Sequence, residues 1–502
     1  MSSPTNLHLY ILAAPLVAAF VLNLLGRLSR RWVMPLTLGP LVFSTAGSLM
    51  LLARVLKEGG FSYTVGNWTP PYGIELLVDP LSAMMLVLIS GIALTATFSA
   101  LPWVEREHPG SEHLFFTLYL ILIAGLMGLV LTADAFNLYV LLEITSITTY
   151  GLIAMGKGRA PLASFNYIIM GSIGACFYLL GIGYLYILTG SLNMADMAAI
   201  IKTLPQGPAL ATAFAFAIVG LWVKMAFFPL HGWLPNAYSL APTAAGLLFA
   251  PLMTKVTIYL MIRVILNVFT PEYVFYSHPL VQSGVVWAAA IAIVCASSLA
   301  LGQRDLRRML TYILIAEVGY MVGGFWLANS QGMTGAILHI FNDAVMTLCL
   351  FLAAAAIASR TGSLSFDNLK GLYRTMPVTM AAFTVGAFSI IGVPPTCGFF
   401  SKWYLLQGAV QAGQWGFLAA LLFSSLVNAI MFFRIIELAY FTDDGEAHHG
   451  GHHHGDDHHA PVAEAPLPML APLVVTAAAL LVIGLGTGPI VSAIRLTLPK
   501  FL

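Results

Sequence analysis

The chain has 502 residues, of which 59% are hydrophobic and only 9% are charged, and its mean hydropathy is +0.88. These values lie outside the range of soluble domains and indicate a polytopic membrane protein. A net charge of +1 argues against a nucleic-acid partner.

Apolar runs long enough to cross a bilayer, about 18 residues or more, predict an all-α protein with about fourteen transmembrane helices. The runs begin near Leu7, Val33, Leu76, Leu114, Ala135, Ala163, Leu210, Ala244, Leu280, Leu306, Met333, Pro377, Trp415 and Leu467. The first run has no preceding basic segment and no A-x-A-type site, so we interpret it as the first span and not as a cleavable signal peptide.

The loops between the runs alternate in charge. Those that follow odd-numbered spans hold most of the basic residues, namely Arg27, Arg30, Arg31, Arg106, Lys157, Arg159, Arg304, Arg307, Arg308, Arg360, Lys370 and Arg374. The positive-inside rule places these loops in the cytoplasm and both termini on the non-cytoplasmic side of a prokaryotic inner membrane.

Two spans contain prolines that should interrupt their helices. Span seven reads Lys224-Met-Ala-Phe-Phe-Pro229-Leu-His231-Gly-Trp-Leu-Pro235, and span twelve contains Pro394-Pro395. Proline removes a backbone donor and clashes with the preceding turn. Interrupted backbone at membrane depth is tolerated only inside protein or beside a water cavity, and paired broken helices point to an ion path.

Four charged residues lie inside apolar runs: Glu143, Lys224, Lys255 and Lys402. An unpaired charge at mid-membrane costs roughly 2.5–3.5 kcal/mol, so such residues usually face a bundle interior where they move ions or protons.

The intramembrane charges recur at a nearly constant offset. Lys224 and Lys402 are 178 positions apart, Lys255 and Arg434 are 179 apart, and Glu143 and Glu317 are 174 apart. The offset spans five helices, an odd number, which predicts two inverted five-helix repeats, spans 4–8 and 9–13. The predicted units are 1–112, three helices; 113–270, the first repeat; 271–441, the second; 442–465, a His/Asp-rich cytoplasmic loop; and 466–502, a last helix.

Several motifs resemble one family. They are Leu141-Leu142-Glu143, the span-seven segment from Lys224 through Pro235-Asn-Ala, Leu252-Met-Thr-Lys255-Val, Arg304-Asp-Leu-Arg-Arg-Met-Leu and Gly398-Phe-Phe-Ser-Lys402. The chain resembles, over nearly its whole length, the antiporter-like subunits of respiratory complex I, membrane-bound hydrogenases and Mrp cation/proton antiporters. It is most similar to the Mrp D-type subunit.

The resemblance implies that Glu143, Lys224, Lys255 and Lys402 form a proton pathway. The chain departs from the family at three positions: Glu317 stands where glutamine is common, Thr347 where lysine is common, and Asp343 is an added carboxylate. We expect these changes to rewire the centre of the second half.

The chemistry expected of these groups is proton relay. Desolvation and a nearby carboxylate act in opposite directions on the proton affinity of a buried lysine. Lys224 can therefore hold or release a proton as Glu143 approaches or withdraws, and the like charge of Lys255 favours release. Lys402 would be the exit or re-entry group, and His339, with an unperturbed pKa of about 6.5, suits a relay between the halves.

Each residue also has a structural interpretation. Glu143 and Lys224 could form a static pair, Lys255 could extend to an interface, and Lys402 could be interfacial. Glu317 and Asp343 are either functional carboxylates or local partners of Arg307, Arg308 and polar neighbours. The remaining alternatives are His339 as a core histidine, Arg434 as a structural charge and His231 as a cap on the interrupted backbone.

Neither a cofactor nor a metal site is predicted. The four cysteines are scattered singly, and there is no redox motif or dinucleotide fingerprint. The segment from Asp443 to His459 contains seven histidines but no fixed ligand spacing, so we interpret it as a solvated linker.

The leading hypothesis is a proton-translocating subunit of a multisubunit monovalent cation (Na⁺)/proton antiporter, with other membrane subunits and the lipid bilayer as partners. The alternatives are a membrane-arm subunit of an NADH–quinone oxidoreductase or hydrogenase-like complex, which leaves enzyme membership open, and a membrane subunit of an inorganic-carbon uptake complex.

Overall fold

The computed structural model describes residues 6–441 and 463–498. Within these ranges, 12 helices are long and apolar enough to cross a membrane, and two shorter apolar helices are the broken spans. The spans are α1 Leu7–Leu28, α2 Val33–Glu58, α3 Pro80–Glu107, α4 Glu112–Leu131, α5 Ala135–Ala154, α6 Ala160–Thr189, α8 Pro208–Lys224, α10 Thr243–Val264, α11 Pro279–Leu301, α12 Leu306–Trp326, α13 Ser330–Thr361, α15 Pro377–Ile391, α17 Trp415–Phe441 and α18 Leu467–Leu485. The fourteen predicted apolar runs each correspond to one of these helices.

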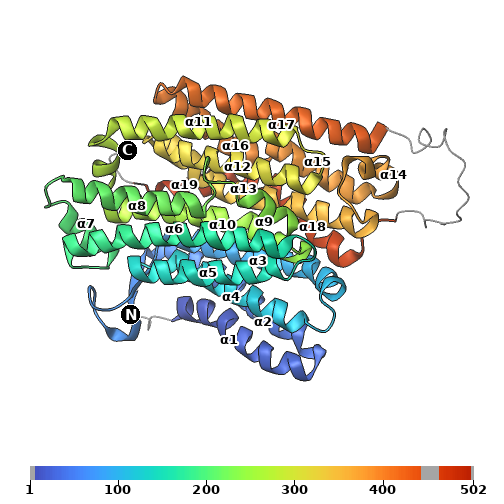
Figure 1. Cartoon of the computed structure of the whole chain (residues 1–502), viewed down its shortest axis with the longest axis horizontal. Helices are drawn as coiled ribbons and strands as arrows, with labels where there is room; N and C mark the ends of the chain where they lie inside the picture. Colours follow the sequence, from blue (N-terminus) through green and yellow to red (C-terminus); the bar gives the residue numbers. More distant parts are fainter. Residues whose placement is uncertain (1–5, 442–462, 499–502) are drawn as a thin grey trace, which may run out of the picture.

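Five further helices are short: α7 Met194–Ile201, α9 Leu234–Leu240, α14 Leu372–Thr375, α16 Cys397–Gln411 and α19 Thr487–Arg495. The helices form one elongated bundle, with α1 and α2 at one edge and α11 and α17 at the other (Figure 1). The predicted His-rich segment from Asp443 to His459 lies outside the described residues.

The innermost helices are apolar on all sides. The most apolar 18-residue windows of α10, α12 and α13 are 100%, 94% and 89% buried, against 28% for α1 and 33% for α2. A helix that is hydrophobic all round is the expected core element of a large membrane bundle. Charged side chains on α10, α12 and α13 are therefore far from lipid and must find partners within the protein.

The structure contains a β-hairpin that the sequence analysis does not predict. Phe61–Thr64 (β1) pairs antiparallel with Glu75–Val78 (β2), so the segment around Leu76 is a strand and the third span begins only at Pro80. The sequence carries the signal for this boundary, because Asp79 accepts a hydrogen bond from the backbone N–H of Ser82 and Pro80 occupies the first helical position. The apolar-run criterion misses it because β2 is itself apolar.

Both broken spans have the predicted interruption. In span seven α8 ends at Lys224, Ala226 adopts a positive φ of 58°, and the chain resumes as α9. In span twelve α15 ends at Ile391, and Gly392 has a φ of 94°, a conformation that glycine adopts at little cost. At this break the carbonyl oxygen of Val223 accepts a hydrogen bond of 3.0 Å from the indole Nε1 of Trp233, the capping role that the sequence suggests for His231.

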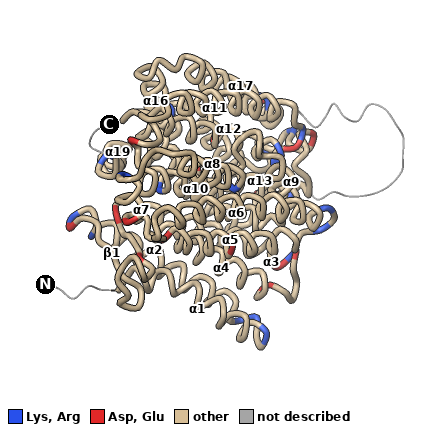
Figure 2. The backbone as a smooth tube through the Cα atoms, turned by 60° about the vertical axis from the view of Figure 1, so that its left-hand side comes forward, with Lys and Arg blue, Asp and Glu red and all other residues tan. Residues whose placement is uncertain are grey.

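The basic loop positions gather at one end of the bundle, opposite the two ends of the chain (Figure 2). This distribution is the one from which the positive-inside rule predicts a cytoplasmic face.

Candidate functional site

The first part of the site joins α5 to the end of α8. The ammonium group of Lys224 lies 3.1 Å from Oε1 of Glu143 and donates a hydrogen bond of 2.7 Å to the hydroxyl of Ser146. The Lys224 side chain is 3% exposed and that of Glu143 is 26% exposed. Glu143 is thus the more exposed partner of the pair.

The second part joins α10 to α13. Nζ of Lys255 lies 2.8 Å from Oδ2 of Asp343, and both side chains are almost completely buried. Thr347 donates a hydrogen bond of 3.0 Å to Oδ1 of the same carboxylate and accepts one of 3.4 Å from Lys255. The ionic partner of Lys255 is therefore Asp343, on a helix of the predicted second repeat.

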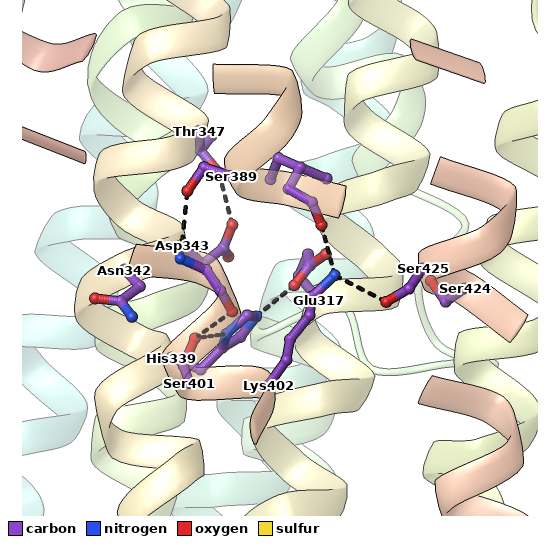
Figure 3. A network of polar contacts seen from close by, with 12 residues as sticks. Glu317, His339, Asn342, Asp343, Thr347, Ser389, Ser401, Lys402, Ser424 and Ser425 are labelled. Atoms are coloured by element: carbon purple, nitrogen blue, oxygen red, sulfur yellow. Dashed lines mark hydrogen bonds and ion pairs between the residues drawn. The ribbon is translucent and has the colours of Figure 1, made fainter. Parts of the chain in front are cut away.

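The third part lies one turn before Asp343, toward the start of α13, and is shown in Figure 3. His339 contacts Oε2 of Glu317 on α12 through its Nε2, and its Nδ1 lies 2.8 Å from the hydroxyl of Ser401 on α16. His339, Asp343 and Thr347 are spaced i, i+4, i+8 and so share one face of α13. This spacing, visible in the sequence, is the signal that could have grouped them.

The last part is Lys402 on α16. Its Nζ donates hydrogen bonds to the carbonyl oxygens of Ile390 (2.5 Å) and Ile391 (3.4 Å), and to the hydroxyl of Ser425 on α17 (3.3 Å). It also lies 5.1 Å from the ring centroid of Tyr320, whose ring is 5.4 Å from that of His339. Tyr320 thus lies between the third and fourth parts.

Lys224 and Lys402 occupy equivalent electrostatic positions but different sequence positions. Lys224 is the last residue before its helix break, whereas Lys402 follows its break and reaches back to the last two carbonyls of α15. Both ammonium groups therefore lie at the carboxyl end of an interrupted half-helix, where the partial negative charge of the helix favours a cation. The offset of 178 therefore aligns two lysines that lie on opposite sides of their helix breaks.

The charges of the whole row offset one another. The residues of the row, ordered from α5 to α16, are Glu143, Lys224, Lys255, Asp343, Glu317, His339 and Lys402, that is, three lysines, three carboxylates and one histidine. Between the first two parts, Thr149 on α5 is 3.8 Å from the sulfur of Met253 on α10. Pairing and hydrogen bonding reduce the cost of burying each charge and leave groups that can exchange protons.

The geometry bears on two structural interpretations in the second half. Glu317 and Asp343 do not contact the arginines at the start of α12: Arg307 instead donates to the carbonyl oxygen of Ala241 and the hydroxyl of Thr243. Arg434 is exposed and lies against the ring of Phe366, outside the row.

Sequence reasoning does not identify the hydroxyl groups of Ser146, Ser401 and Ser425, because serine is common on transmembrane helices. Among the described residues there is no cluster of three or more His, Cys, Asp or Glu side chains placed to hold a metal ion.

Comparison with known proteins gives a consistent result. Residues 132–428 match the family described as NADH:quinone oxidoreductase/Mrp antiporter, transmembrane. A Desulforudis audaxviator protein named NADH-quinone oxidoreductase subunit N is 40% identical over 499 residues, which are 98% of this chain and 99% of that protein. The D-type Na(+)/H(+) antiporter subunit of Alkalihalophilus pseudofirmus is 32% identical over 403 residues, 80% of each chain. A chain in the structure of the Mrp complex from a Dietzia species superimposes with a TM-score of 0.87 at 25% identity, covering 98% of this chain and 96% of that one.

Proposed function

Since the chain belongs to the NADH:quinone oxidoreductase/Mrp antiporter transmembrane family, we propose that it is a proton-translocating subunit of a multisubunit monovalent cation/proton antiporter. The observation that carries the proposal is the row of paired acids and bases that runs from Glu143 to Lys402 through the most buried helices. A structural scaffold has no need of such a row, because each buried charge costs free energy.

In the proposed mechanism Glu143 controls the first step. While its carboxylate lies beside Lys224, the ammonium form is stabilised; when it moves toward the outer face of α5, Lys224 releases its proton inward. Lys255, Asp343, His339 and Glu317 carry the charge onward, and Lys402 exchanges the proton at the far end. The cation is proposed to use other subunits of the complex.

The topology forms part of the same proposal. The helices of 113–270 and 271–441 act as two inverted repeats, 1–112 and 466–502 flank them, and both termini lie on the non-cytoplasmic side of a prokaryotic inner membrane. The charge distribution of the loops supports this orientation.

A redox-driven complex is the second candidate. The 40% identity to a protein named NADH-quinone oxidoreductase subunit N, over nearly the full length of both chains, favours it. The relay would be the same and the energy source would differ.

Purification of the intact complex from its native membrane through a tag on this chain separates the candidates. Small membrane subunits alone, with proton movement that depends on added Na⁺, are expected for the antiporter. Flavin or iron–sulfur proteins in the complex would overturn that assignment in favour of the redox enzyme, and a soluble zinc protein would favour inorganic-carbon uptake. A Lys224→Ala chain, purified in parallel, controls for assembly.

A further inference from the structure

A charged pocket lies at the end of the bundle that carries the basic loops. It has a volume of about 210 Å³ and is formed by the end of α3, the loop between α5 and α6, the α9–α10 junction and the start of α12. Its charged or titratable lining residues are Glu107, His108, Lys157 and Arg307. These residues belong to loops or helix ends that the sequence places on one side of the membrane.

Two buried polar atoms of this pocket have no hydrogen-bond partner among the described residues. Oε1 of Glu107 accepts a hydrogen bond from the backbone N–H of Thr243, but its Oε2 is buried and makes no hydrogen bond to another described residue. Nε2 of His108 is in the same situation. Buried polar atoms of this kind are ordinarily satisfied by ordered water. The pocket therefore has the polarity of a hydrated vestibule.

Helix α5 connects this pocket to Lys224. Its last residue is followed by Met155 and Gly156, which line the pocket, and Ser146, ten residues before Gly156, binds the Lys224 ammonium. At 1.5 Å per residue this separation is about 15 Å. Tyr150 lies between them, one turn from Ser146, so its side chain occupies the middle of the route.

The Tyr150 hydroxyl faces Ser146 but makes no direct hydrogen bond to another described residue. A continuous set of rings leads from it toward the pocket: Tyr150 to Tyr167 at 4.7 Å, Tyr167 to Trp233 at 3.9 Å, and Trp233 to Tyr238 at 6.1 Å between centroids. Tyr238 also has a buried hydroxyl without a partner in the described chain, and its neighbour Ser239 lines the pocket.

We propose that the pocket at Glu107 and His108 is where protons enter the relay and that the Tyr150 hydroxyl passes them to Ser146 and Lys224. The inference rests on the proposed function. In the transfer step a hydronium ion on the pocket side gives a proton to Oη of Tyr150 and is left as water, while Tyr150 gives its own proton, through Ser146, to the neutral amine of Lys224. Tyrosine and serine are unchanged afterwards, and the amine becomes an ammonium group.

The charges around the pocket suit proton uptake. Glu107 faces Lys157 and Arg307, and Arg307 in turn faces Asp305. Burial, and then the charge of Lys157, lower the pKa of His108 below its ordinary 6.5, so the imidazole is neutral at pH 7 and can accept a proton. The charged groups that face Glu107 are therefore two cations, and the neutral His108 lines the same pocket.

Helix α6 provides a matched pair of variants. A Cβ added at Gly171 would lie 1.9 Å from Oη of Tyr150, whereas one added at Gly183, on the same helix, meets nothing within 4 Å. Both substitutions replace a helical glycine by alanine, but only Gly171→Ala displaces the hydroxyl. Tyr150→Phe removes the hydroxyl and keeps the ring packing, so it gives a second measurement if Gly171→Ala folds poorly.

Proton flux is measured in vesicles containing the intact complex, at several pH values on the pocket side. Tyr150→Phe and Gly171→Ala are each expected to lower the flux about a hundredfold or more, the range of a lost proton-transfer group, and Gly183→Ala to leave it unchanged. Glu107→Gln is expected to alter the pH profile on the pocket side, and Glu107→Asp to restore it. If Lys224→Ala is inactive but Tyr150→Phe has the wild-type flux and Glu107→Gln the wild-type pH profile, this inference is overturned. If Lys224→Ala is itself active, the proposed function is overturned instead.

Discussion

Nζ of Lys255 lies 2.8 Å from Oδ2 of Asp343, and the pair joins two of the most buried helices of the bundle, α10 and α13. The resemblance to the family places a lysine commonly at position 347, where this chain has a threonine. Here Thr347 instead donates to the Asp343 carboxylate and accepts from Lys255. At this position one lysine and one carboxylate are therefore paired, and the hydroxyl of Thr347 bridges the two.

Asp343→Asn tests this pair. The variant leaves Lys255 in the core without a counter-charge, and removal of one partner from a buried pair costs about 3–5 kcal/mol. We expect a lower melting temperature of the complex in detergent and at least about a tenfold loss of proton flux. Thr347→Val is the control, because it removes only the bridging hydroxyl and should cause a much smaller loss. Equal effects of the two variants would contradict an ionic role for Asp343.

The contact between His339 and Glu317 yields a second prediction. Glu317→Gln keeps the size of the side chain but removes the carboxylate that contacts Nε2 of His339. We expect proton flux to fall by about tenfold or more while assembly of the complex is retained. Ser401→Ala, which removes the partner of Nδ1 at 2.8 Å, should reduce flux less because the carboxylate remains. A Glu317→Gln complex that transports at the wild-type rate would show that His339 is a core histidine only.

The contributions of Lys402 and Ser425 to proton flux can be distinguished by mutation. Lys402→Met removes the ammonium group from the end of α15, and we expect flux to be lost. Ser425→Ala leaves the two carbonyl bonds at 2.5 and 3.4 Å in place, so flux should fall by less than about threefold, as for the loss of one ordinary hydrogen bond. Flux assays in vesicles with matched amounts of complex make the comparison. Normal transport by Lys402→Met would place this lysine outside the pathway.

Stability at acid pH depends on Asp79, which lies before the first residue of α3. Burial alone would raise the pKa of Asp79, but the charge and hydrogen bond of Arg263, together with hydrogen bonds from Ser82, lower it below 3.8. A lowered carboxyl pKa contributes stability that is present above pH 3.8 and is lost as the pH falls through the lower folded value. Asp79→Asn retains the helix cap but loses the ion pair. We expect it to be about 2 kcal/mol less stable near pH 6 and to show less change between pH 6 and pH 3 in thermal unfolding. Parallel pH curves for the variant and the wild type would contradict the linkage.

Much of the fold follows from the sequence because the bilayer imposes a simple rule. Each of the fourteen spans needs a long apolar run, and each helix break needs proline or glycine, as at Pro229 and Gly392. The β-hairpin escapes prediction because Leu76–Val78 is as apolar as the helix that follows. Strand pairing between Phe61 and Val78 depends on a contact between segments 17 residues apart, which apolar length alone does not encode.

The sequence predicts several residues of the candidate site, but it does not predict which acid pairs with which base. Glu143, Lys224, Lys255 and Lys402 stand out because charge is rare in an apolar run. Which base meets which acid depends on how α10 packs against α13, so the Lys255–Asp343 pair is visible only in three dimensions. A constant offset in residue number also does not show on which side of a helix break a residue lies. For that reason it aligns Lys224 with Lys402, although one precedes its break and the other follows it.

The most direct test of the central claim is proton flux through the intact complex with Lys224→Ala, reconstituted into vesicles and compared with the wild type at equal amounts of assembled complex. Lys224 contacts both Glu143 and Ser146 at the start of the row, so the account predicts that flux driven by a cation gradient or by a redox substrate falls to the background of empty vesicles. Flux at the wild-type rate in a correctly assembled Lys224→Ala complex would show that protons do not travel along the row of charges from Glu143 to Lys402.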